Sequence, residues 1–117
     1  MRIPTLATTT FLVVAAATAA RAHAFLDHAE PRVGSTVPAA PKEVVLTFSQ
    51  KVEAAFSSVE VSDAKGTRVD EGKPAVSATT MRIRVKPLPP GTYHVRWHVL
   101  SVDTHSTEGN FAFQVGK

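Results

Sequence analysis

Apolar and polar residues alternate along most of the chain that follows the first two dozen positions. Residues 43–48 form a compact run rich in β-branched and aromatic residues, and residues 58–62 and 81–85 alternate apolar with polar side chains. Residues 92–100 form the longest expected strand, and residues 110–115 form the last one. A period of two residues is typical of half-buried strands, so we predict at least five of them.

Turn-forming residues separate these expected strands. The proline and glycine clusters at residues 31–35 and 38–41 exclude a helix, residues 63–66 predict a turn, and residues 87–91 form a cluster of strand breakers. No helical period of 3.6 residues follows residue 22. This arrangement predicts an all-β domain, either a β-sandwich or a Greek-key β-barrel.

The longest expected strand has one apolar and one basic face. Its alternating side chains divide into Tyr93, Val95, Trp97 and Val99 on one face and His94, Arg96 and His98 on the other. We therefore expect Trp97 to anchor the core. His94 and His98 are expected to face solvent, because four strand residues separate their Cα atoms by ~13 Å, which is too far for a simple mononuclear metal site.

The first 22 residues have the order of a secretory signal peptide. Arg2 supplies the positive charge, residues 6–20 form an apolar run, and Ala20-Arg21-Ala22 offers a cleavage site. The run is shorter than the ~20 apolar residues that span a bilayer, which disfavours a membrane anchor. We expect cleavage after Ala22, with residues 23–117 as one domain that begins at His23; cleavage after Ala24 is the alternative.

Composition narrows the function classes. The chain contains no cysteine, which excludes disulfides, thiolate metal sites and lipid attachment at a cysteine. Loss of Arg2 and Arg21 with the signal lowers the formal charge from +3 to about +1, and no basic patch predicts nucleic-acid binding. We expect a periplasmic monomer without a stable membrane anchor.

Asp103 and His105 are the first candidate metal ligands. In extended chain their side chains leave the same face, with Cα atoms ~7 Å apart, so both can reach one ion. An N-terminal His23 would add its α-amine and its imidazole as a six-membered chelate. Nitrogen donors joined by one carboxylate suit copper(II), which heads the divalent affinity order.

The sequence resembles the CopC family of bacterial copper-resistance and copper-homeostasis proteins. The resemblance covers residues 23–117: a histidine directly after the signal, the segment Ala29 to Ser35, and the run Val44 to Ser49. Its most specific part is the block from Gly91 to His105, in which Gly-x-Tyr-x-Val-x-Trp leads into Ser-x-Asp-x-His, followed by Gly109 and by Phe111 to Val115.

This resemblance implies a cupredoxin-like Greek-key fold of immunoglobulin-like type. It also implies that His23, through amine and imidazole, Asp103 and His105 bind one copper(II) ion. Some members carry a methionine-rich copper(I) site, but here Met81 stands alone once Met1 is removed, which points to the copper(II)-only branch. His28 is not required by the family pattern and is expected to be a surface residue.

The function expected from these features is a periplasmic copper(II) carrier or buffer, not an enzyme. Its expected partners are copper ion and either an inner-membrane copper transporter or another copper protein. One alternative is a copper oxygenase with a histidine brace, which Asp103 disfavours because a carboxylate would occupy the position that oxygen needs. The other is a β-sandwich binding module without metal, in which the histidines are incidental.

Overall fold

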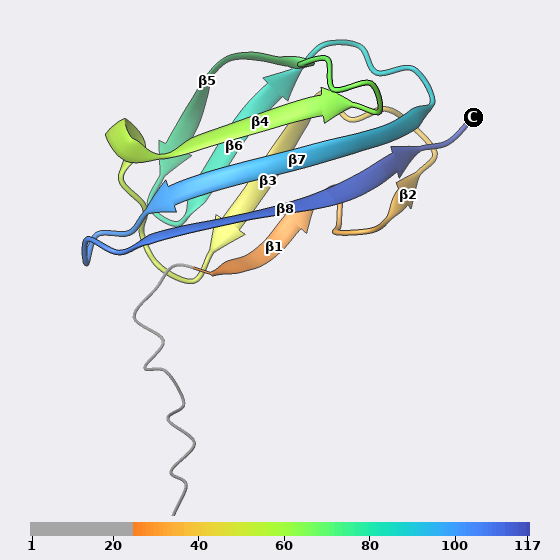
Figure 1. Cartoon of the computed structure of the whole chain (residues 1–117). Helices are drawn as coiled ribbons and strands as arrows, with labels where there is room; N and C mark the ends of the chain where they lie inside the picture. Colours follow the sequence, from red (N-terminus) through yellow and green to blue (C-terminus); the bar gives the residue numbers. More distant parts are fainter. Residues whose placement is uncertain (1–24) are drawn as a thin grey trace, which may run out of the picture.

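The structure, a computed structural model, describes residues 25–117 and contains two packed β-sheets (Figure 1). The expected signal peptide and His23 lie outside the described residues. The strands are β1 (Leu26–Glu30), β2 (Thr36–Val37), β3 (Glu43–Phe48), β4 (Ser58–Asp63), β5 (Asp70–Ser77), β6 (Thr80–Val85), β7 (Gly91–Leu100) and β8 (Ser106–Val115). A single 3-10 turn, η1 (Ala54–Phe56), precedes β4.

Each sheet contains four strands. One has the order β1-β3-β6-β5, and the other has the order β2-β8-β7-β4. All pairs are antiparallel except β2 with β8, which is parallel. The prediction of an all-β fold is therefore confirmed, in the form of a two-sheet sandwich rather than a closed barrel. Residues 25–117 contain no helix long and apolar enough to cross a membrane.

The inner faces of the two sheets form one hydrophobic core. Every second residue of β3 and β6 is buried, as the alternating sequence predicts. Trp97 is 7% exposed and packs its ring edge-on against Phe48, with ring centroids 5.1 Å apart. Met81 is fully buried in the same core. The expected role of Trp97 as a core residue is confirmed.

Three strands were not expected from the sequence: β1, β2 and β5. They lie at sheet edges, where only part of each side-chain row is buried. β5 also contains Gly72 and Pro74, which weaken a strand signal, and its pairing with β6 is irregular between Glu71 and Ala75. Proline and glycine are tolerated there because an edge strand needs fewer backbone hydrogen bonds.

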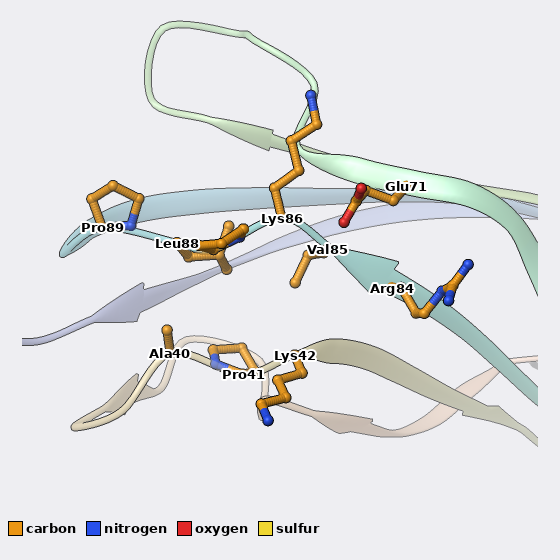
Figure 2. Close-up of a pocket in the computed structure, with 10 residues that line it drawn as sticks. Ala40, Pro41, Lys42, Glu71, Arg84, Val85, Lys86, Leu88 and Pro89 are labelled. Carbon is orange, nitrogen blue, oxygen red and sulfur yellow. The ribbon is translucent and has the colours of Figure 1, made fainter.

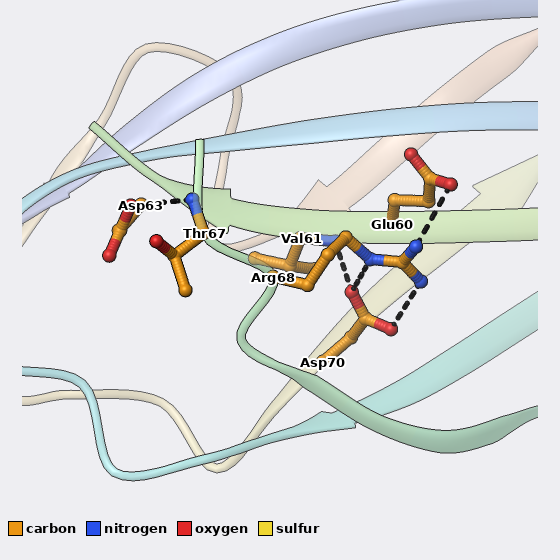
Figure 3. A network of polar contacts seen from close by, with 6 residues as sticks. All are labelled: Glu60, Val61, Asp63, Thr67, Arg68 and Asp70. Carbon is orange, nitrogen blue, oxygen red and sulfur yellow. Dashed lines mark hydrogen bonds and ion pairs between the residues drawn. The ribbon is translucent and has the colours of Figure 1, made fainter. Parts of the chain in front are cut away.

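A polar network holds the connection between β4 and β5 (Figure 3). Asp70 accepts hydrogen bonds from Nε and from a terminal nitrogen of Arg68, each 2.8 Å long, and from the backbone N–H of Val61 at 2.9 Å. Arg68 also contacts Glu60 at 3.1 Å. Burial of the Asp70 carboxyl would raise its pKa, but the hydrogen bonds outweigh that effect and the pKa is lowered. Asp70 is therefore a carboxylate that fixes the turn.

Candidate metal site

The candidate ligands lie in the hairpin that joins β7 to β8. The two strands stay in register up to the pair Leu100 and Ser106, and the backbone N–H of Ser101 donates to the carbonyl of His105 at 2.9 Å. Inside this loop the N–H of Thr104 donates to the carbonyl of Ser101. Thr104 has φ 72°, a left-handed conformation that is uncommon for a β-branched residue. The chain therefore reverses direction between the two candidate ligands.

Asp103 and His105 are in direct contact in this turn. The Nδ1 atom of His105 lies 3.4 Å from Oδ1 of Asp103. The Asp103 side chain is 32% exposed and that of His105 is 52% exposed, so both are open to solvent on one side. The sequence placed these residues in an extended segment; the structure brings them together by a tight turn instead. In either geometry, one carboxylate and one imidazole converge.

The hydroxyl of Ser101 orients the Asp103 carboxylate through a hydrogen bond. The Ser101 side chain is almost fully buried, and its hydroxyl donates to Oδ1 of Asp103 and lies 3.2 Å from the carbonyl oxygen of His105. The backbone N–H of His105 adds a 3.3 Å contact to the same Oδ1. The hydrogen bond from Ser101 is the main cause that lowers the pKa of Asp103 below its ordinary value. Asp103 is thus held as an oriented anion.

Ser101 is a functional candidate that the sequence did not single out. In the sequence it stands only as the first residue of the Ser-x-Asp-x-His motif. The available signal was a serine at the end of an apolar strand, two residues before an acid, since a hydroxyl buried at such a position needs a hydrogen-bond acceptor.

The start of the described chain is tied to the same end of the sandwich. The carbonyl of Phe25 accepts a 2.8 Å hydrogen bond from the N–H of Ser49, and the carbonyl of Lys51 accepts one of 3.1 Å from the N–H of Val102. The short segment from Ser49 to Lys51 therefore contacts both the beginning of β1 and the hairpin. In Figure 1 the start of β1 and the β7–β8 hairpin lie toward the same end of the molecule.

The remaining histidines of the described chain are set apart from this hairpin. His94 and His98 are exposed on the outer face of β7, opposite Ala112 and Glu108 of β8. His28 is exposed on β1 and contacts Glu30 at 2.9 Å. Between residues 25 and 117, no three histidine, aspartate or glutamate side chains gather into a metal-binding group. Asp103 and His105 are thus a pair, and the predicted third residue, His23, is outside the described range.

Comparison with known proteins gives a consistent family match. The CopC domain model matches residues 26–116. Protein YobA of Escherichia coli K12 is 37% identical over 98 residues, which cover 80% of this chain and 79% of YobA. The crystal structure of CopC from Methylosinus trichosporium OB3b superposes with a TM-score of 0.72 at 36% identity, covering 80% of this chain and 94% of that one. PcoC, described as a methionine-rich copper resistance protein from Escherichia coli, gives a TM-score of 0.71 at 35% identity, covering 80% and 99%.

Proposed function

The chain belongs to the CopC family, and we propose that it is a periplasmic protein that binds one copper(II) ion and carries or buffers it in copper homeostasis or resistance. The observation that carries this proposal is the Asp103–His105 pair, held in one turn with the carboxylate oriented by Ser101. PcoC, a relative of the same fold, is a copper resistance protein.

The proposed ligands are the α-amine and imidazole of His23, the carboxylate of Asp103 and the imidazole of His105. Three nitrogens and one oxygen form a donor set that suits the tetragonal coordination of copper(II). Asp103 and His105 in the hairpin supply two of these four donors. The hydrogen bond between Phe25 and Ser49 supports His23 as the source of the other two, because it ties the chain two residues after His23 to the segment that also contacts the hairpin.

This ligand set requires that the signal is removed after Ala22. An internal histidine has no free α-amine, so only a chain that begins at His23 can close the six-membered chelate. We therefore propose residues 1–22 as a cleaved signal peptide and residues 23–117 as the exported, monomeric domain.

Copper(I) is not expected to be the cargo of this protein. Copper(I) prefers soft thiolate and thioether ligands. The sequence has no cysteine, and Met81 is fully buried in the core, with no access to solvent. The proposed role is a carrier, not an enzyme, that releases copper(II) to an inner-membrane transporter or to another copper protein.

The test is a copper(II) titration of the processed protein against single variants. Asp103→Ala and His105→Ala should each weaken binding about 10-fold or more without abolishing it, because each removes one ligand while the amine and imidazole of His23 still hold the ion. His94→Ala and His98→Ala are matched controls, because both histidines are exposed on the outer face of β7. Equal affinity of all four variants would contradict the assignment of the hairpin as the site.

A further inference from the structure

A groove lies at the end of the sandwich opposite the hairpin. Its volume is about 710 Å³, and it is formed where the chain enters β3 and leaves β6 (Figure 2). Pro89 borders it just before β7 begins at Gly91, whereas Asp103 and His105 follow the other end of that strand. A strand of this length spans ~30 Å, so a ligand in the groove would not touch the candidate copper ligands.

The floor of the groove is apolar. Val85 and Leu88, which are 7% and 5% exposed, belong to the hydrophobic core and also line this space. Figure 2 shows Ala40 and Pro41 on one side of the groove and Val85 and Leu88 on the other. The volume lies within the range of ~300 to 1,000 Å³ that small-molecule sites usually have.

The rim of the groove is basic. Lys42, Arg84 and Lys86 border it, and Glu71 is the single acidic residue among those that line it. In the described part of the chain, no hydrogen bond or ion pair joins the side chains of these three cations to an acidic group. Lys42 and Lys86 extend away from the groove in opposite directions (Figure 2). Their flexible four-carbon stems allow both ammonium groups to fold toward an anion at the rim.

The lining also determines which ligands are disfavoured. Pro41, Pro87 and Pro89 have no backbone N–H, and the lining contains no aromatic residue. A sugar or the base of a nucleotide would therefore find no stacking partner, and the only side-chain donors of the lining are the three cations of the rim. An aliphatic chain that ends in one negative group fits this arrangement, since the floor can bury the chain and the rim can attract the charge.

We propose that this groove binds an aliphatic carboxylate of the fatty-acid type, independently of copper. The proposal commits to the free amphiphile, one molecule per groove, on the basis of the apolar floor and the unpaired basic rim.

The probe for the test is dodecanoate below its micelle concentration, and the readout is the shift of backbone amide NMR signals on titration. Saturable shifts centred on Lys42, Val85, Lys86 and Leu88 are expected. Dodecyltrimethylammonium has an alkyl chain of similar length and the opposite charge, so it should bind at least tenfold more weakly. Equal binding of the two probes, shifts centred elsewhere, or binding only to anionic vesicles would overturn the proposal.

Two variant pairs locate the site. Ala40→Trp places a large ring on an exposed lining residue and should abolish the titration, whereas Ala39→Trp, at the adjacent exposed position, should not. Lys42→Glu/Lys86→Glu should weaken dodecanoate binding roughly tenfold relative to Lys51→Glu/Arg96→Glu, which changes the net charge equally at two exposed residues that do not line the groove. Identical binding by both members of either pair would refute the assignment.

Discussion

At the residue scale, the candidate copper site depends on a buried hydroxyl. Ser101 donates a hydrogen bond to Asp103 and lies near the carbonyl of His105, so it orients one proposed ligand and braces the turn that carries the other. A hydroxyl that is hydrogen-bonded to a ligand in this way restricts the ligand to a productive orientation before the metal arrives.

Ser101→Ala should therefore weaken copper(II) binding by about 10-fold, because Asp103 loses the partner that orients it. The matched control is Ser57→Ala. The hydroxyl of Ser57 accepts a 3.2 Å hydrogen bond from the N–H of Leu100 at the same end of β7, without contacting Asp103. Copper(II) titrations, with thermal unfolding of both variants in the apo form, separate orientation from stability. An affinity unchanged in Ser101→Ala would show that the hydroxyl has no such role.

The Asp70 carboxylate is expected to stabilise the fold in a pH-dependent way. The Asp70 side chain is 7% exposed and accepts hydrogen bonds from Arg68 and from the backbone of Val61. Asp70→Asn should lower the free energy of unfolding by about 1–3 kcal/mol at neutral pH, because a charged acceptor of several donors is lost. Glu60→Gln, which alters only an exposed contact of Arg68, should cost less than about 1 kcal/mol.

The pH dependence of this effect follows from the lowered pKa of Asp70. A carboxyl whose folded pKa lies below its unfolded value stabilises the fold above the unfolded value, near ~3.9, and loses that contribution as the pH falls through the folded pKa. The stability difference between wild type and Asp70→Asn should therefore be full at neutral pH and shrink below pH ~4. Urea unfolding across this range is the measurement, and a difference independent of pH would contradict the ionic role of Asp70.

At the element scale, the β7–β8 hairpin positions Asp103 and His105, and one glycine of β8 leaves room for the core tryptophan of β7. Gly109 lies opposite Trp97, and a Cβ atom built on it would lie 2.6 Å from Cζ2 of the indole. No real side chain tolerates that distance. The glycine therefore leaves the space that the buried indole occupies against β8.

Gly109→Ala should reduce the free energy of unfolding by about 1–3 kcal/mol, since the indole or the strand must shift. Gly116→Ala is the control, because its added methyl group would meet only atoms 3.6 Å away. Chemical denaturation of both variants tests this prediction. Equal stability of the two variants would contradict this prediction, since it would mean that the Trp97 indole can move aside without loss of free energy of unfolding.

The strands that could be predicted from the sequence differ physically from those that could not. β3, β4, β6 and β7 alternate because one face of each is buried in the core and the other is not. β1 and β5 are edge strands with only partial burial, so their local sequence pattern is weak. They become strands because they pair with β3 and β6. Likewise, the sequence predicted the Asp103–His105 pair from its spacing, but not Ser101, whose role depends on a turn that the spacing did not reveal.

At the scale of the whole molecule, the structure separates two ends with different chemistry. The hairpin end offers a carboxylate and an imidazole, and the far end offers an apolar groove with a basic rim. Neither end supplies clustered sulfur.

Metal selectivity should follow from this distribution of donors. Copper(II) should bind well ahead of zinc(II) and nickel(II), and copper(I) should be retained weakly or not at all, because nitrogen and oxygen donors are present and accessible sulfur is not. Competition dialysis with each ion checks the order. Retention of copper(I) comparable to that of copper(II) would contradict the proposed cargo.

The most direct test of the central claim concerns the α-amine of His23. Two proteins should be compared by copper(II) titration: one that begins at His23, and one that carries a single additional residue before it. Both keep Asp103, His105 and every side chain of the domain, but only the first can close the six-membered chelate. We expect the extended protein to bind copper(II) more than about 100-fold more weakly, since a direct donor contributes more than an outer-shell partner. If the two proteins bound copper(II) with the same affinity, the amine would not be a ligand and the proposed site would be wrong.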